Sequence, residues 1–457
     1  MSDDKYDYAR VKDELGAWCD ENRITEVECL VPDLSGIARG KILPTEKFLK
    51  GILSDAHRLP EGIFTQMVTG DFPDTDGIVP LMDIDVTLHP DVSTMRPVPW
   101  YGEPTGQVIC DCIYPDGRPV DISARQVLRN VLKLYSDKGW KPIVAPEVEM
   151  YLVKTNVDPD LPLEAPVGRS GRVETGRQAF GIDAANEFDS IFEDVYDYCE
   201  ATQIDIDTLN HEAGVAQMEV NFLHGDPLDL ADQVFLFKRT LRQTAINHGV
   251  FATFMAKPMQ NEPGSALHIH QSLYDVKTDE NIFSNSDGSN SDLFLSYIAG
   301  LQTYAQDIMP MFAPNVNSYR RFTYEEAPIN THWGRDNRSC GLRVPRSGND
   351  ARRIENRLPG ADVNPYLAIA ATLACGYLGM TEGLKPTAEE TGNAYEHERD
   401  LPYHLSDALE RFEENENLRK VLGERFVDLL CIVKRDEQDT YDRVISSWER
   451  EHLLLNV

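Results

Sequence analysis

The segment Ala145-Pro-Glu-Val-Glu-Met-Tyr-Leu152 carries the pattern that decides the fold of this chain. A β-strand sends alternate side chains to opposite faces, so residues two apart share a face and lie about 7 Å from each other. Glu147 and Glu149 therefore share one face of a predicted strand, while Val148 and Met150 share the other. One face can line a site while the other packs against a core.

Three further segments, at residues 211–222, 264–273 and 353–358, repeat this arrangement. Their polar faces hold Glu212, just before the strand, and Glu219; then His268, His270 and Ser272; and finally Arg353, Glu355 and Arg357. Taken singly, each segment could be an ordinary amphipathic strand with one solvated face. Solvated faces favour Lys and Thr, however, whereas these faces carry Glu, His and Arg. The combination favours a lining that binds ligands and phosphate.

The side chains on these faces indicate divalent metal ions. Five glutamates and one or two histidines supply mainly hard oxygen donors, which suit Mg²⁺ or Mn²⁺ better than a thiolate-bound transition metal. So many carboxylates imply more than one ion.

Arginines and the absence of glycine-rich loops indicate how a nucleotide would be held. Arg338, Arg343, Arg353 and Arg357 offer planar donor forks for phosphate and carboxylate oxygens. The sequence contains no G-x-x-x-x-G-K-[ST] loop and no G-x-G-x-x-G turn. Any nucleotide must therefore be held by metals and arginines instead of a glycine cradle.

The composition limits the classes of partner. A chain of 457 residues exceeds what one hydrophobic core usually supports, which predicts two domains. The formal net charge of −32 would repel phosphate backbones and anionic lipid, so neither nucleic acid nor membrane is expected as a partner. The eight cysteines are scattered without a C-x-x-C pair, and the N-terminus lacks a secretory signal. Both observations indicate reduced thiols in the cytoplasm.

Local periodicities predict the domain organisation. Apolar residues at helical spacing predict a helix over residues 8–22, and Glu26 to Val31 then alternates like a strand. After the turn at 114–117, a helical pattern begins near Ser123. We therefore expect an N-terminal helix (1–23), a small mixed domain (24–118) and a larger domain (119–457). The apolar stretch 366–380 is too short to span a membrane and predicts a buried helix.

Six separated motifs give the chain a resemblance to the glutamine synthetases from about residue 24 to the C-terminus. The motifs are Glu147-Val-Glu149, His211-Glu…Gln217-Met-Glu219, Gly264-Ser-x-x-His-x-His270, Asn317-Ser-Tyr-Arg-Arg321, Asn337-Arg338 to Arg343-x-Pro345, and Arg353-Ile-Glu355-x-Arg357. The series is specific because all six stand in the family's order.

The resemblance implies a role for each matched residue. The implied metal ligands are Glu149, Glu212 and Glu219 on the glutamate side, and Glu147, His268 and Glu355 on the ATP side. Arg321 and Arg357 would bind glutamate and the transferred phosphoryl group, and the backbone of Gly264 would contact the amino acid. Arg338, Arg343 and Arg353 would bind ATP and phosphate. His270 and Ser272 would lie near the nucleotide. Arg321 and Arg338 would also act in catalysis, and Glu326 matches the flap glutamate that helps to deprotonate the amine.

The resemblance also implies an α+β fold, ATP with two or three Mg²⁺ or Mn²⁺ ions per site, and an oligomer. The expected fold is an N-terminal β-grasp domain followed by a catalytic domain with a curved antiparallel sheet flanked by helices. Active sites of the family lie between neighbouring subunits of hexameric rings, which commonly stack as dodecamers.

One departure from the family concerns the acceptor. The stretch Phe64 to Gly70 stands where glutamine synthetases bind ammonium beside an Asp-Gly-Ser-Ser loop, and it lacks that carboxylate. Met67 would widen an acceptor pocket and make it apolar, as an amine with a carbon chain requires. We expect a ligase that joins the γ-carboxylate of glutamate to an amine such as putrescine or another alkylamine through γ-glutamyl phosphate, as γ-glutamylamide ligases do. The alternatives are an ammonia-using glutamine synthetase and a catalytically silent relative.

Overall fold

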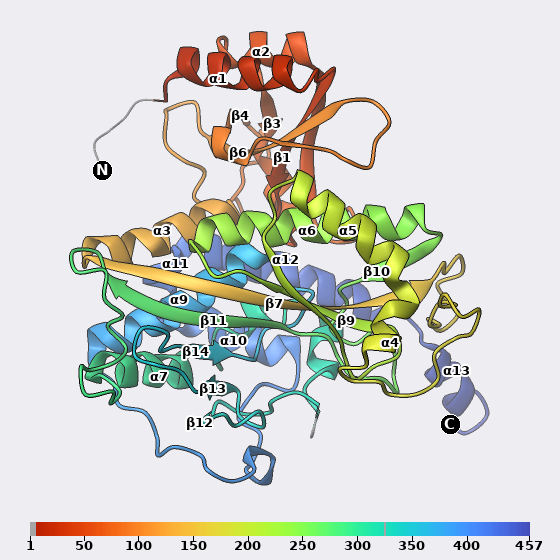
Figure 1. Cartoon of the computed structure of the whole chain (residues 1–457), viewed down its shortest axis with the longest axis vertical. Coiled ribbons are helices and arrows are strands. Elements are labelled where there is room, and N and C mark those ends of the chain that lie inside the picture. Colours follow the sequence, from red (N-terminus) through yellow and green to blue (C-terminus); the bar gives the residue numbers. More distant parts are fainter. Residues whose placement is uncertain (1–5, 324–325) are drawn as a thin grey trace.

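The structure is a computed structural model that describes residues 6–323 and 326–457. It contains a six-stranded sheet built from residues before 114 and an eight-stranded sheet built from residues after 139. Figure 1 shows the first sheet and its helices above the second, with α3 (Ala124–Asp137) and α6 (Pro227–Asn247) in the layer between them. The fold class is therefore α+β, as expected.

The first sheet is mixed, with strand order β2-β1-β6-β4-β3 and β5 paired to β6. Its elements are α1 (Tyr8–Glu21), β1 (Glu26–Pro32), β2 (Ala38–Pro44), α2 (Thr45–Ile52), β3 (Arg58–Pro60), β4 (Asp85–Pro90), β5 (Arg96–Pro97) and β6 (Thr105–Ile113). Within this sheet β1 pairs with β6 in parallel, with Glu26 opposite Thr105 and Leu30 opposite Ile109. The sequence of β1 alternates between polar and apolar residues, but both of its faces are buried. The buried Glu28 carboxylate is paired with Arg239 of α6 at 2.6 Å.

The second sheet has the order β12-β13-β14-β11-β7-β9-β8, with β10 paired to β7. Its strands are β7 (Trp140–Lys154), β8 (Ile206–His211), β9 (Gln217–Phe222), β10 (Val250–Thr253), β11 (Leu267–Asp275), β12 (Trp333–Arg335), β13 (Leu342–Val344) and β14 (Ile354–Asn356). All pairings are antiparallel except that of β12 with β13, which is parallel. The expected antiparallel sheet is therefore confirmed for every strand pair except this one at the sheet edge, where β12 and β13 run in the same direction.

Helices cover this sheet. They are α3 (Ala124–Asp137), α4 (Ile182–Ala185), α5 (Asp189–Ala201), α6 (Pro227–Asn247), α7 (Asp292–Tyr304), α8 (Met309–Phe312), α9 (Pro365–Glu382), α10 (Leu405–Glu414), α11 (Glu416–Leu422), α12 (Glu424–Asp442) and α13 (Ser447–Leu453). The predicted buried helix is α9, which Asn364 caps and Gly383, with φ of 64°, terminates. Gly300 of α7 and Gly379 of α9 let the two backbones touch, because a Cβ at Gly379 would lie 2.5 Å from the Gly300 Cα.

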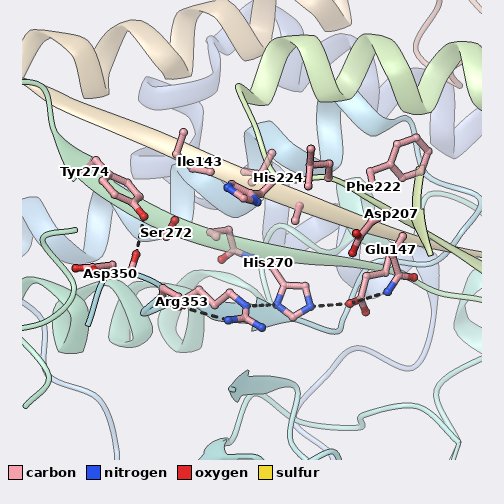
Figure 2. A pocket seen from close by; sticks show the side chains of 16 residues that line it. Ile143, Glu147, Asp207, Phe222, His224, His270, Ser272, Tyr274, Asp350 and Arg353 are labelled. Carbon is pink, nitrogen blue, oxygen red and sulfur yellow. Dashed lines mark hydrogen bonds and ion pairs between the residues drawn. The ribbon is translucent and has the colours of Figure 1, made fainter. Parts of the chain in front are cut away.

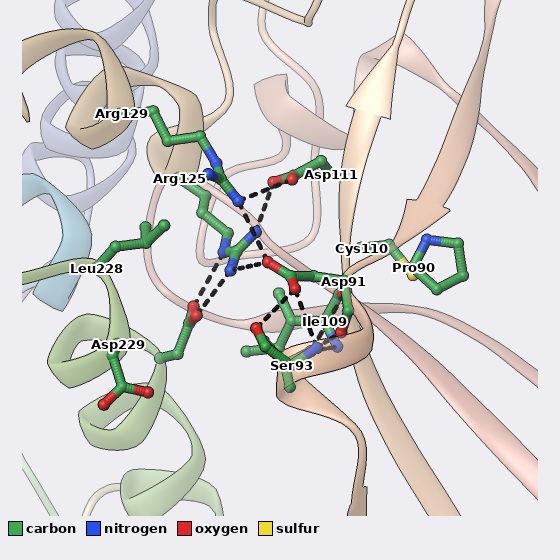
Figure 3. A network of polar contacts seen from close by, with 12 residues as sticks. Pro90, Asp91, Ser93, Ile109, Cys110, Asp111, Arg125, Arg129, Leu228 and Asp229 are labelled. Carbon is green, nitrogen blue, oxygen red and sulfur yellow. Dashed lines mark hydrogen bonds and ion pairs between the residues drawn. The ribbon is translucent and has the colours of Figure 1, made fainter. Parts of the chain in front are cut away.

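A buried ion-pair network joins the first sheet to the helical layer (Figure 3). Arg125 of α3 contacts Asp91, Asp111 and Asp232 at 2.7–2.8 Å, and Arg129 contacts Asp91 and Asp111 at 3.0–3.2 Å. Burial alone would lower the pKa of Arg125, but the charges of Asp232 and Asp111 hold its pKa well above the usual range. The network fixes how the two sheets sit relative to each other.

Candidate active site

The register of the second sheet brings the predicted polar faces together. Glu147 of β7 lies opposite His268 of β11, Glu149 of β7 lies opposite Glu219 of β9, and His270 of β11 lies opposite Glu355 of β14. Like charges directly opposite each other on neighbouring strands destabilise a sheet unless something offsets them. The pairing of Glu149 with Glu219 therefore calls for a cation.

Five of the six predicted metal ligands form two groups whose ligand atoms lie within 4.8 Å of one another. The groups are Glu147, His268 and Glu355, and Glu149, Glu219 and His268. His268 Nδ1 lies 3.4 Å from the Glu147 carboxylate and 3.8 Å from that of Glu355, whereas Nε2 faces Glu149 at 4.0 Å. A neutral imidazole has one free lone pair, so the tautomer of His268 decides which ion it can ligate.

The sixth predicted ligand, Glu212, lies in the turn between β8 and β9, outside both groups. Its charge nevertheless raises the pKa of a carboxylate in one of these groups. Burial, followed by the charge of Glu212, raises the pKa of Glu149 to about 7, and burial with the charge of Glu219 raises the pKa of Glu212 to about 7. Burial and the charges of Glu147 and Glu149 raise the pKa of Glu219 to about 8.

The grouping of these ligand atoms within 4.8 Å of one another, together with the raised pKa values, supports a site for a divalent cation. The chain gathers more carboxylates than it can ionise together, and an ion with two positive charges would stabilise the ionised forms. Burial, with the charge of Arg357, lowers the pKa of His268 to about 4, so its imidazole is neutral and able to bind a metal. A set of carboxylate oxygens with one imidazole suits Mg²⁺ or Mn²⁺.

Glu355 differs from the other carboxylates because arginines contact it directly. Arg343 Nη1 lies 2.7 Å from one carboxylate oxygen and Arg357 Nη1 lies 2.6 Å from the other. Burial opposes ionisation of Glu355, but the charge of Arg357 outweighs it and brings the pKa to about 2. The Nε atoms of both arginines are buried without a hydrogen-bond partner.

A cavity of about 360 Å³ opens beside the ATP-side ligands, and Glu147, His270, Ser272 and Arg353 line it (Figure 2). Arg353 Nε donates to His270 Nδ1 at 3.3 Å, so the ring proton sits on Nε2 and points to Glu147 Oε1 at 2.9 Å. The cavity has an apolar part near Phe222 and Ile143. Its size and mixed lining are typical of a small-molecule site.

Three amides that the sequence interpretation missed orient the carboxylates. Asn210 Nδ2 donates to Glu219 at 3.3 Å, Gln217 Nε2 to Glu149 at 3.5 Å, and Asn221 Nδ2 to Glu147 at 3.4 Å. Gln217 and Asn221 stand two residues either side of Glu219, so the same period-two pattern could have found them. Such second contacts fix the direction in which a ligand carboxylate points.

Gly264 and Arg321 lie against each other beside this site. A Cβ at Gly264 would lie 2.6 Å from Arg321 Cγ and 2.7 Å from the Ala256 carbonyl oxygen. Arg321 is only 2% exposed and donates to the carbonyls of Leu358 and Arg357 at 2.8 and 2.9 Å. Burial lowers its pKa to about 10, so it keeps its charge at neutral pH. Within this chain Arg321 therefore positions the backbone that carries Arg357.

Glu326 is held by cations from two other segments. Lys257 Nζ contacts Glu326 Oε2 at 3.0 Å and Arg177 Nη2 approaches Oε1 at 3.7 Å. The neighbours of Glu326 in the quoted flap motif, Tyr324 and Glu325, lie outside the described residues. Arg338 is exposed, and its charge acts on Glu212.

Comparison with known families identifies the protein class. The family described as "Glutamine synthetase, catalytic domain" matches residues 121–453. The chain belongs to the glutamine synthetase family. It is therefore a ligase by family, and the resemblance of the six motifs is confirmed.

Several members of the glutamine synthetase family are similar over nearly the whole chain. Gamma-glutamylputrescine synthetase PuuA of Escherichia coli (strain K12) is 34% identical, over 94% of this chain and 92% of that protein. Glutamate–isopropylamine ligase of Pseudomonas sp. is 32% identical, over 94% and 95%. Glutamine synthetase of Mycolicibacterium smegmatis is 33% identical, over 86% and 90%. The solved structure of GmaS without ligand has a TM-score of 0.81 and 25% identity, and covers 96% of this chain and 99% of its own.

Met67, the residue predicted to line the acceptor pocket of this family member, lies in the first sheet's domain. It is buried in the apolar core, and the next residue, Val68, donates its backbone N–H to Glu437 of α12 at 2.8 Å. Within one chain it is not among the residues that line the cavity. In the part of the chain that the structure describes, no helix is both long and apolar enough to cross a bilayer.

Proposed function

We propose that this chain uses ATP to join the γ-carboxylate of glutamate to an alkylamine, through γ-glutamyl phosphate. The observation that carries the proposal is the convergence of two carboxylate–histidine groups on one sheet face beside a nucleotide-sized cavity. Membership of the family indicates the class of reaction. The geometry supports a choice of residues for metal binding, for phosphoryl transfer and for removing a proton from the amine.

Two or three Mg²⁺ or Mn²⁺ ions are proposed at this face. Glu147, His268 and Glu355 would hold one ion, and Glu149, Glu219 and Glu212 another. Bound there, the ions would neutralise phosphate and carboxylate charge during phosphoryl transfer. The amides of Asn210, Gln217 and Asn221 would keep the carboxylates in place before the ions arrive.

The chain's own cations would stabilise the transferred phosphoryl group. Arg343 and Arg357 both contact Glu355, and their guanidinium charges would stabilise oxygens that gain charge in the transition state. Arg353 lines the cavity and Arg338 is exposed to solvent, and both would contact the remaining phosphates of a nucleotide triphosphate. His270 and Ser272 line the same cavity.

Glu326 is proposed to take a proton from the incoming amine. An alkylamine has a pKa of about 10, close to that of lysine, so it arrives as an ammonium and cannot attack until it loses a proton. Lys257 Nζ, itself an alkylammonium, already sits 3.0 Å from Glu326. The contact supports the proposal that this carboxylate receives an alkylammonium group.

The acceptor is proposed to be an alkylamine because the stretch Phe64 to Gly70, which contains Met67, lacks the carboxylate of the ammonium-binding loop, and because two relatives are named for amine ligation. The test is ADP release with saturating glutamate and Mg²⁺, comparing ammonium with putrescine, spermidine, ethanolamine, methylamine and isopropylamine. We expect at least one alkylamine to exceed ammonium in kcat/KM by about 10-fold or more, since each buried methylene adds about 0.8 kcal/mol. A preference for ammonium would establish an ordinary glutamine synthetase instead.

The same assay separates the catalytically silent alternative. Failure to form ADP with any amine, under either Mg²⁺ or Mn²⁺, would favour a structural or regulatory relative. Glu147→Gln is expected to abolish activity, whereas Glu164→Gln is the matched control, because Glu164 pairs only with exposed Lys154 at 2.8 Å, away from both metal groups.

We also propose that the chain divides into residues 1–23, 24–118 and 119–457, works in the cytoplasm and assembles into hexameric rings or dodecamers. The C-terminal segment supports assembly, because Trp448, Leu454 and Leu455 are exposed apolar side chains at the end of the chain. Mass photometry should show six or twelve subunits, and a monomer would contradict the assembly.

A further inference from the structure

A third group of metal-ligating side chains lies outside the site described above. His332 directly precedes β12, and Glu390 and His397 belong to the segment between α9 and α10. Their ligand atoms lie within 4.8 Å of one another. His397 Nε2 is 2.6 Å from Glu390 Oε2, and His332 Nδ1 is 3.9 Å from the same oxygen.

Both imidazoles face this oxygen, His397 in direct contact and His332 at a longer distance. Their rings stack with centroids 4.3 Å apart and an angle of 11° between planes. His397 is exposed, whereas His332 and Glu390 are half-buried. The group therefore has a solvent-facing side through which an ion could enter and a water could complete its coordination.

The backbone behind the group is fixed by hydrogen bonds. Glu390 N–H donates to the Trp333 carbonyl at 2.8 Å, which ties the loop to β12. Glu390 Oε1 accepts from the Gly392 N–H at 2.6 Å, which leaves Oε2 directed at the two rings. Asn337 Nδ2 donates to the carbonyls of Glu390 and Gly392. Ligands held by such secondary contacts need little reorganisation to bind a metal.

We propose that His332, Glu390 and His397 form a binding site for a Zn²⁺-class transition metal ion, separate from the carboxylate-rich active site. Two imidazoles and one carboxylate favour Zn²⁺, Co²⁺ or Ni²⁺ over Mg²⁺, because Mg²⁺ prefers oxygen donors and retains its waters. The proposal does not depend on the amine-ligase function.

The geometry needs only small shifts to accept the ion. Ligand atoms about 2.0–2.1 Å from a tetrahedral ion lie about 3.3 Å from each other. The His397–Glu390 distance of 2.6 Å would therefore lengthen, and the His332–Glu390 distance of 3.9 Å would shorten, each by less than about 1 Å. His397 must present its Nε2 lone pair, so its ring proton moves to Nδ1 and no net proton is required. Water would occupy the fourth position.

The ion would fasten the segment between α9 and α10 to the edge of the second sheet. From residue 383 to residue 404 this segment contains only the short 3₁₀ helix η5 (Ala394–Glu396). A cross-link to His332 would hold Glu390 and His397 against β12. Limited proteolysis within this segment should slow when the ion binds.

The test measures Zn²⁺ bound to the full chain by equilibrium dialysis and metal analysis, with excess Mg²⁺ present to compete at the oxygen-rich ligands. We expect wild type to bind one Zn²⁺ per chain more than His332→Ala or His397→Ala. His248→Ala is the matched control, because His248 pairs with Asp194 at 2.7 Å and is absent from the three metal-ligating groups found among the described residues. It should bind as much Zn²⁺ as wild type.

Equal Zn²⁺ content in wild type and both site variants would overturn the proposal. The milder variant Glu390→Gln, which keeps the side-chain size, should also lose the extra ion. Should the variants unfold, X-ray absorption of wild type with one Zn²⁺ per chain decides the question. Two imidazole nitrogens and one carboxylate oxygen at about 2.0–2.2 Å support the site, and an oxygen-dominated shell refutes it.

Discussion

Replacing Arg125 with Met should destabilise the protein because it leaves a carboxylate buried without its cation. The Arg125 side chain is 2% exposed and contacts three aspartates. Asp91 and Asp111 keep Arg129 and are partly hydrated, so they lose little. Asp232, 8% exposed, loses a bidentate contact at 2.7 and 3.0 Å and keeps only the Tyr366 hydroxyl at 2.5 Å.

The expected cost is about 3–5 kcal/mol, the usual loss when one partner of a buried ion pair is removed. With an unfolding entropy of about 2.1 cal/mol/K per residue, a chain of 457 residues should then melt about 3–5 °C lower. Differential scanning fluorimetry at fixed protein and Mg²⁺ concentrations measures the shift. Arg129→Met is the control, since Arg129 is 35% exposed and should cost less than about 1 kcal/mol.

A second substitution tests the cause. Asp232→Asn in the Arg125→Met background removes the stranded charge, so the double variant should melt above the single variant. If Arg125→Met melts within 1 °C of wild type, or if Asp232→Asn gives no recovery, the assignment of the cost to Asp232 is refuted.

Three further predictions concern the active site. In the absence of metal, the raised pKa values of Glu149 and Glu219 stabilise the fold below the ordinary glutamate pKa, and this stability is lost as pH rises through about 7–8. The melting temperature in EDTA should therefore fall from about pH 5 to about pH 8, and saturating Mg²⁺ should remove most of the fall. Melting temperatures that fall equally with pH in EDTA and in Mg²⁺ would contradict this. Gly264→Ala should lower kcat/KM for glutamate about 100-fold by displacing Arg321, whereas Gly225→Ala, whose Cβ would meet Leu230 at an ordinary 3.7 Å, should not. Lys257→Met should slow amine transfer about 10-fold while glutamate-dependent phosphoryl transfer persists, and equal losses in both steps would show that Lys257 does not position Glu326.

The polar face of the second sheet was predictable from sequence because strand periodicity is a local property. Glu147 and Glu149 must share a face wherever that strand lies, and the same holds for His268 and His270. Which strand pairs with which depends on tertiary packing, so the opposition of Glu149 and Glu219 became visible only in the sheet register. The parallel edge formed by β12 and β13 was missed for the same reason.

Contacts between loops gave no comparable signal. His332 and His397 are 65 positions apart and follow no shared period, so only the folded chain brings their rings to 4.3 Å. Lys257 is similarly remote in sequence from Glu326, and nothing in the flap motif indicates that an ammonium already occupies that carboxylate. The sequence could name Glu326 but not its partner.

The carboxylates of the active site divide according to where their positive charge comes from. Glu355 has Arg343 and Arg357 in direct contact, and its pKa falls to about 2. Glu149 and Glu219 face each other across two strands, and their pKa values rise to about 7 and 8. His268 belongs to both metal-ligating groups, so its imidazole lies between the two kinds of carboxylate. Under the proposed function, arginines thus supply fixed positive charge where phosphoryl oxygens would gather, and a bound ion would supply the positive charge that Glu149 and Glu219 lack.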